Sequence, residues 1–157
     1  MKLSTRTRYG LRMLVSIAGM QETTSLPVPL YPIAVQQKIS FKYLEKICRT
    51  LKNNGYLLGK RGPDGGYRLR IPPEYIFLGD LLKVLENEMN LIDCCLYETA
   101  CPHSEQCPTK QLWQDLRRTI IDKLNTYTLA DLIHTPHVCL LKETAHETSP
   151  SCPDNAL

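Results

Sequence analysis

The chain has 157 residues, 43% hydrophobic and 22% charged, so it can bury the core of one domain carrying an appendage. No apolar run reaches about 18 residues, which excludes a predicted membrane-spanning helix, and the first residues lack the apolar core of a signal peptide. Seven cysteines in such a chain favour reduced thiols and metal ligation over disulfides, and we expect a cytoplasmic protein with no membrane partner.

Charge is unevenly distributed along the chain. Residues 1–70 hold 13 Lys and Arg against 3 Asp and Glu, whereas residues 71–157 hold 6 against 13. A basic half beside an acidic half is typical of a nucleic-acid-binding region joined to a regulatory region. A solvated basic face would give the same counts, so charge alone leaves both interpretations open.

A first helix is predicted near the N-terminus, where Ser4 or Thr5 can cap it. Its apolar residues recur at helical spacing: Tyr9, Met13, Ile17 and Met20. The segment SLPVPLYP then ends the helix with three prolines.

Two further helices are predicted before residue 56. The first covers residues 31–38, and Ser40 is a candidate N-cap for the second, which Gly55 ends. The second helix is amphipathic and basic, with the apolar stripe Leu44, Ile47 and Leu51. Cys48 lies next to that stripe and is predicted to be a core residue. Two short helices joined by a tight turn indicate a helix–turn–helix.

A β-hairpin is predicted directly after these helices. In YLLGKRGPDGGYRLR, two apolar-rich runs flank PDGG, a dense turn signal. Lys60 and Arg61 on one arm, with Arg68 and Arg70 on the other, make the hairpin basic. A basic hairpin after a helix–turn–helix is typical of a wing, which contacts phosphates or a minor groove.

Two more helices are predicted beyond Pro72-Pro73. The first carries four leucines on one face: Leu78, Leu81, Leu82 and Leu85. The second begins after Thr109, a candidate N-cap, and is long, with the stripe Trp113, Leu116, Ile120, Leu124 and Tyr127. This stripe must pack either on its own domain or on a second subunit. We favour the second subunit, because proteins that read the major groove usually dimerise.

The predicted fold is therefore mainly α with a small β-hairpin wing: a winged helix–turn–helix followed by a long C-terminal dimerisation helix. We divide the chain into a DNA-binding domain over residues 1–75, a cluster-binding loop and dimerisation helix over 76–133, and a disordered tail over 134–157.

The stretch CLYETACPHSEQC contains Cys95, Cys101 and Cys107, with five residues between neighbours. Thiolates are soft ligands that hold iron–sulfur clusters or zinc. Structural zinc sites usually contain cysteines about two to four residues apart, a pair that these three do not form. The spacing therefore favours an iron–sulfur cluster, while zinc and a metal-free thiol switch remain alternatives.

With these elements in place, the chain resembles the Rrf-type winged-helix transcription regulators, in their cysteine-bearing, IscR/NsrR-like branch. The resemblance covers residues 1 to about 133 and rests on MKLSTRTRYGLRML, ISFKYLEKICRTLKNNGYL, RGPDGGYRL, the three cysteines, and CPTKQLWQDL followed by TLADLI. It implies a homodimer in which the long helix, 109–126, crosses its mate. It also implies a double-stranded DNA operator as partner, with each recognition helix in the major groove.

The resemblance further implies which residues contact DNA: Lys42, Tyr43, Glu45 and Lys46 on the recognition helix, and Arg61 in the wing. Arg49 and Lys60 are basic residues of the same elements and are added as candidates. Glu45 could accept from a cytosine amino group, and Arg61 could enter a narrow minor groove. The alternatives are a packing role for Tyr43 and a solvated charge for Glu45.

The fourth ligand of a cluster is open. Lys110 stands where the IscR-like branch has a histidine, and Arg8 stands where some NsrR-like members have an aspartate. Cys94 and His103 are candidates, and a site with three protein ligands is an alternative. The cluster type, [2Fe–2S] or [4Fe–4S], stays undecided.

We therefore expect a transcriptional regulator, acting as a repressor, whose operator binding is modulated by an iron–sulfur cluster that senses iron, redox state or nitric oxide. The main alternative is a metal-free or zinc-bound regulator that responds to thiol oxidation or to a partner enzyme. An electron-carrier or cluster-delivery protein is less favoured, because a carrier needs no basic wing. No catalytic motif is legible, so we expect no enzymatic activity.

Overall fold

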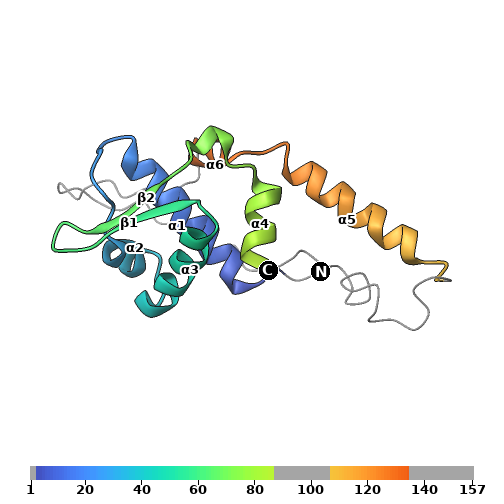
Figure 1. Ribbon diagram of the computed structural model, residues 1–157, viewed down its shortest axis with the longest axis horizontal. Helices are drawn as coiled ribbons and strands as arrows, with labels where there is room; N and C mark the ends of the chain where they lie inside the picture. Colours follow the sequence, from blue (N-terminus) through green and yellow to red (C-terminus); the bar gives the residue numbers. More distant parts are fainter. Residues whose placement is uncertain (1–2, 87–106, 135–157) are drawn as a thin grey trace, which may run out of the picture.

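The computed structural model describes residues 3–86 and 107–134, and within them the predicted mainly α fold with one β-hairpin is confirmed (Figure 1). The elements in chain order are α1 (Thr5–Gln21), α2 (Leu30–Gln36), α3 (Phe41–Asn53), β1 (Leu57–Lys60), β2 (Gly66–Leu69), the short 3-10 helix η1 (Pro73–Tyr75), α4 (Leu78–Glu86), α5 (Lys110–Leu124) and α6 (Leu129–Ile133). Among these helices, none is long and apolar enough to cross a membrane.

Helix α1 forms the centre of the protein, in contact with α3, α4 and α6. Ser4 caps it as predicted, since the Thr7 backbone N–H donates to the Ser4 hydroxyl at 3.3 Å. On the predicted stripe, Met13 and Ile17 are fully buried, while Tyr9 and Met20 pack partly exposed against the core. The backbone N–H of Ser4 also donates to Glu86 Oε1 at 2.8 Å, which joins the start of α1 to the last residue of α4.

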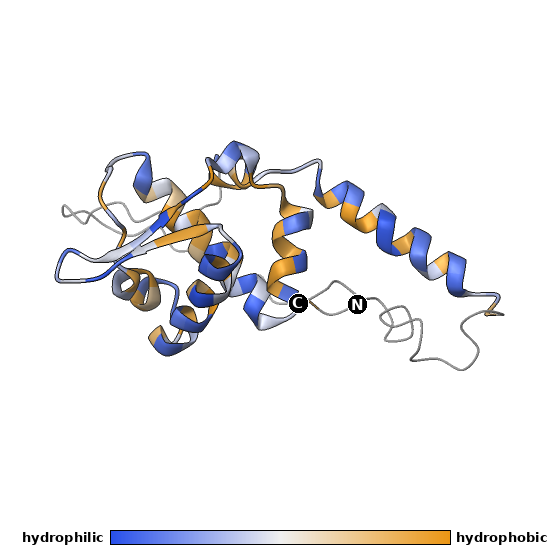
Figure 2. Cartoon of the chain, in the orientation of Figure 1, coloured by the Kyte–Doolittle hydropathy of each residue, from blue (hydrophilic) through white to orange (hydrophobic). Residues whose placement is uncertain are grey.

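The helices that precede the hairpin in the sequence and those that follow it share one hydrophobic core. All the predicted stripe residues of α3 and α4 are buried: Leu44, Ile47, Leu51, Leu78, Leu81, Leu82 and Leu85. Leu129 and Ile133 of α6 are buried in the same core, so a helix more than 100 residues distant in the chain closes over α1. Burying a side chain of this size contributes about 1.5–3 kcal/mol. Figure 2 shows the hydrophobic residues concentrated on α1 and α4.

The hairpin is antiparallel, with Leu57 opposite Leu69 and Lys60 opposite Gly66. Its turn contains Gly62 at a φ of 112°, a conformation that favours glycine. A second glycine is required by packing: the backbones of Val28 and Tyr67 exchange hydrogen bonds of 2.9 and 2.8 Å, and a Cβ at Gly66 would clash with the Val28 carbonyl oxygen. The predicted PDGG turn is confirmed, and the linker between α1 and α2 is hydrogen-bonded to the end of β2 that lies next to this turn.

Helix α5 is anchored at its C-terminal end and otherwise runs away from the body of the protein (Figure 1). Just beyond it, the Tyr127 carbonyl accepts from the Leu78 N–H at 3.0 Å, and Asn125 Oδ1 accepts from the Asp80 N–H at 3.2 Å. A Cβ at Gly79 would clash with that same Asn125 oxygen, so the glycine allows the close approach. No residue of α5 is buried.

Three local predictions were wrong in detail. The helices begin after Ser40 and Thr109 as expected, but neither hydroxyl accepts a capping hydrogen bond. The Thr109 hydroxyl instead lies 3.4 Å from Cys107 Sγ. The long helix ends at Leu124, so Tyr127 is not part of its stripe, because the residues after Leu124 hydrogen-bond to the start of α4.

Candidate nucleic-acid interface and cysteine segment

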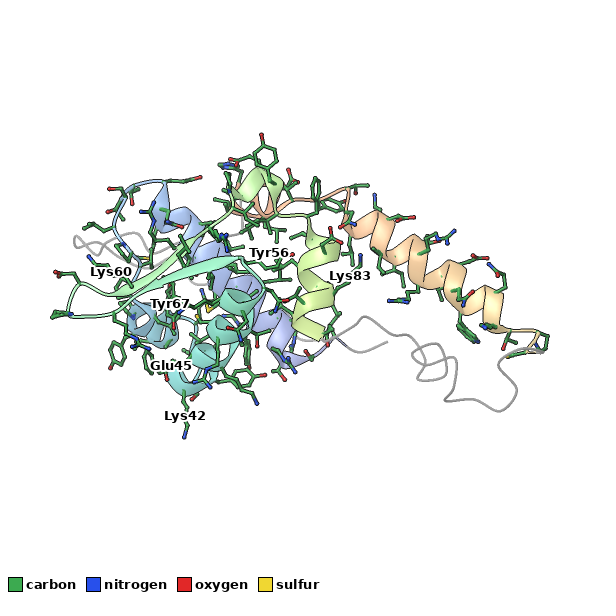
Figure 3. The ribbon with its side chains drawn as sticks, in the orientation of Figure 1. Lys42, Glu45, Tyr56, Lys60, Tyr67 and Lys83 are labelled. Carbon is green, nitrogen blue, oxygen red and sulfur yellow. The ribbon has the colours of Figure 1, made fainter. Side chains whose placement is uncertain are left out.

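The outward face of α3 is basic. Burial of its apolar stripe fixes the helix against the core and leaves four predicted contact residues exposed: Lys42, Glu45, Lys46 and Arg49. Figure 3 shows Lys42 directed away from the body of the protein. Gly55, at a φ of 79°, ends the helix as predicted, and the chain turns directly into the hairpin.

The hairpin extends this basic face. Lys60 ends β1, Arg61 begins the turn, and both are exposed. Arg68 and Arg70 on the second arm are exposed as well. None of the cations on α3 or the hairpin forms a salt bridge within residues 3–86 and 107–134, where the ion pairs are Lys83–Asp80 and His134–Glu22. Unpaired, exposed cations on two adjoining elements can neutralise the phosphates of one duplex.

Tyr43 differs from the other candidates because it is only partly exposed. Its ring meets the ring of Tyr9 edge to face, with centroids 6.1 Å apart and an interplanar angle of 89°. Packing between α3 and α1 therefore accounts for the position of this ring. Contact between Tyr43 and DNA stays a prediction.

Cys48 is a core residue, as predicted. It is fully buried and its thiol lies 3.4 Å from the Met13 sulfur. Burial, with a smaller contribution from the charge of Glu45, raises the pKa of the Cys48 thiol to about 12. The group therefore stays protonated near neutral pH, and a protonated buried thiol is neither a nucleophile nor a metal ligand.

Cys107 has the opposite environment, at the entrance to α5. A hydrogen bond with the Thr109 hydroxyl, further bonds from the Thr109 and Lys110 backbone and the Lys110 charge lower the pKa of its thiol, against a smaller opposing effect of desolvation. These groups favour the thiolate, which is the form that binds metal and reacts with oxidants.

The remaining predicted ligands, Cys95 and Cys101 with the candidates Cys94 and His103, lie outside the described residues. Within the part of the chain that the structure does describe, no three His, Cys, Asp or Glu side chains gather into a metal site. The structure thus describes one member of the predicted trio, Cys107, whose surroundings favour the thiolate. It leaves the geometry of the trio a prediction.

Two exposed aromatic side chains beside the basic face were not predicted to belong to the site. Tyr31, near the start of α2, and Phe41, the first residue of α3, are 67% and 42% exposed. Their ring centroids lie 6.3 Å apart at an interplanar angle of 58°. An aromatic residue at each end of the segment YPIAVQQKISF was the available sequence signal.

A known protein family and several known proteins are similar to this chain. The Rrf2 family, described as an iron-dependent transcriptional regulator, matches residues 3–135. The protein rrf2 of Nitratidesulfovibrio vulgaris is 40% identical over 139 residues, which cover 88% of this chain and 91% of that protein.

Two similar solved structures are those of regulators named CymR and IscR. The oxidised form of CymR from Staphylococcus aureus has a TM-score of 0.64 and 35% identity, covering 86% of this chain and 98% of that one. IscR from T. potens has a TM-score of 0.65 and 31% identity, covering 85% and 86% of the two chains.

Proposed function

This chain belongs to the Rrf2 family of transcriptional regulators, and we propose that it is a repressor that binds a double-stranded DNA operator as a homodimer under the control of its cysteine segment. As a member of that family it is a DNA-binding regulator and not an enzyme. The observation that carries the proposal is the set of exposed cations on α3 and the hairpin, none of which forms an ion pair within residues 3–86 and 107–134.

In the proposed complex, α3 lies in the major groove and the hairpin follows the neighbouring groove. Lys42 and Lys46 are exposed on α3 and would contact base edges and phosphates, and the exposed Glu45 would accept from a cytosine amino group. Arg61 is exposed at the turn and would enter a narrow minor groove, where the negative potential of DNA is concentrated. Phosphate contacts then fix the register, and the base contacts select the sequence.

Arg61→Ala tests this arrangement. We expect it to weaken operator binding by about 1–3 kcal/mol and to reduce the salt dependence of binding by about one phosphate equivalent, because one groove contact and its released counterion are lost. Fluorescence anisotropy titrations at several salt concentrations measure both quantities. Lys83→Ala is the matched control, since it removes one cation from α4, where Lys83 pairs with Asp80. Equal affinities for Arg61→Ala and Lys83→Ala would exclude Arg61 from the interface.

The proposed dimer rests on the exposure of α5. Leu112 and Leu116 are 59% and 42% exposed on a helix that buries no residue. Figure 2 shows hydrophobic residues interleaved with hydrophilic ones along the helix. An amphipathic helix of this length has little stability without a partner for its apolar face. A second α5 supplies that partner and gives the two-fold symmetry that a palindromic operator requires.

We propose that Cys95, Cys101 and Cys107 hold an iron–sulfur cluster. The donor chemistry fits, because the surroundings of Cys107 favour its thiolate. Such a cluster would supply a bond network that forms or breaks with iron supply and redox state. The chain's own residues would transmit that change: residues 87–109 join α4 to α5, and α4 ends at Glu86, which accepts from the Ser4 N–H.

A second proposal keeps the same DNA interface and replaces the cluster with thiol oxidation. It is supported by the surroundings of Cys107, which lower the pKa of its thiol, and by the similarity to CymR, which is known in an oxidised form. The two proposals differ in whether the protein contains iron and sulfide, so iron and sulfide analysis of the anaerobically purified protein separates them.

A further inference from the structure

We propose that Phe41, positioned by Tyr31, reads the C5-methyl groups of thymines in the major groove of the operator. This inference rests on the proposed role of α3 as the helix that enters that groove. It adds an apolar contact to the charged and polar contacts already proposed, and so predicts operator positions where thymine is preferred over every other base.

Phe41 lies at the N-terminal end of α3. It is the first residue of α3, and the N-terminal residues of a recognition helix are those that contact base edges. Glu45 lies four residues later, so the two side chains occupy the same face of the helix. Phe41 stays 42% exposed although the core lies one turn away at Leu44, which is fully buried.

The neighbours of Phe41 carry the second step. Tyr31 of α2 stands against its ring, with centroids 6.3 Å apart, and limits the directions that the Phe41 side chain can take. Lys38, in the turn between the helices, and Lys42 are both exposed, so the aromatic pair is an apolar spot flanked by cations. Thymine offers the matching surface, because its methyl group is the apolar feature of a groove otherwise lined by polar edges and phosphates.

The test compares thymine with deoxyuridine, which differs only by lacking the methyl group. Duplexes that bind the full-length wild-type protein are first selected from a random library, and each thymine of the selected operator is then replaced singly by deoxyuridine. We expect about a fourfold loss of affinity at one or two positions in each half-site, the factor that corresponds to burying one methyl group. At these positions Phe41→Ala should bind the thymine and deoxyuridine duplexes equally.

Tyr75→Ala is the matched control, since Tyr75 is an aromatic residue of η1 that is 70% exposed. It should keep the full discrimination, whereas Tyr31→Ala should reduce it. Thermal unfolding checks that each variant is folded. If Phe41→Ala does not fold, the comparison of thymine and deoxyuridine duplexes with the wild-type protein can still overturn the inference, and Tyr31→Ala still tests the aromatic pair.

A wild-type protein that selects an operator but binds every deoxyuridine duplex as tightly as the thymine duplex overturns this inference and leaves the proposed function standing. Loss of discrimination in Tyr75→Ala as well overturns it too. A protein that selects no sequence overturns both.

Discussion

A Leu116→Glu variant should be monomeric at micromolar concentration and should lose at least about 100-fold in operator affinity, because one half-site alone binds little better than non-specific DNA. Leu116 is 42% exposed and central in α5, so a carboxylate there would be buried without a partner charge in the proposed interface. The fold of the body should survive, since no residue of α5 is buried. Sedimentation velocity and anisotropy titration measure the two effects.

Gln114→Glu is the control for this prediction. It introduces the same charge on the same helix, but two residues away and therefore on nearly the opposite face. This variant should remain dimeric and retain its operator affinity. If Leu116→Glu also stays dimeric, α5 is not the dimerisation helix.

Cys101→Ala should abolish the visible sulfur-to-iron absorbance of protein purified without oxygen and lower its bound iron and sulfide to background. The reason is that Cys101 is one of three proposed cysteine ligands. Its removal would leave two cysteine ligands and a second iron atom of the cluster without a protein ligand. Operator affinity should change in the same variant, because the segment that joins α4 to α5 would lose its cross-link. Absorbance, iron and sulfide analysis and anisotropy titration on one sample provide the three readings.

Cys152, near the C-terminus, is a cysteine outside the proposed trio, so Cys152→Ala serves as the matched control. The colour and metal content of this variant should equal those of the wild type. Colour and operator affinity that survive in Cys101→Ala would show that the trio is not the switch. A wild-type protein that contains no iron or sulfide, yet changes its operator affinity when its thiols are oxidised, would support the thiol-responsive proposal instead.

Most of the fold could be predicted because its determinants are local. Period-3.6 stripes located α1, α3 and α4, and Gly55 and the PDGG turn located the ends of α3 and of the hairpin arms. These signals depend on side-chain spacing and on backbone conformation, both of which can be read from a short stretch of sequence.

The wrong details depend on contacts between distant segments. The helical periodicity of apolar residues continues to Tyr127, but the helix ends at Leu124. The backbone N–H groups of Leu78 and Asp80 donate to Tyr127 and Asn125, and no local sequence pattern predicts these contacts. The same applies to Thr109, whose hydroxyl bonds with Cys107 rather than capping α5. Helix α6 is only five residues long, too short for a periodic signal, and its capping box is its one local mark.

The candidate site was predictable where it is electrostatic. Basic residues outside an apolar stripe must face solvent, so Lys42, Lys46 and Arg49 were assigned to the surface correctly. The Tyr31–Phe41 pair was missed because the two rings meet only when the turn between α2 and α3 folds, with Lys38 at a φ of 52°. The ligand set was predicted from spacing, and Cys107 alone of the trio lies in the described residues.

The most direct test of the central claim is the affinity of the anaerobically purified wild-type dimer for its selected operator compared with a scrambled duplex of the same composition, at one salt concentration. A sequence-specific regulator should bind the operator at least about 10³-fold more tightly. Removal of iron by chelation, or oxidation of the thiols, should then change the operator affinity and leave the scrambled duplex unaffected. Equal affinity for the two duplexes would contradict the account.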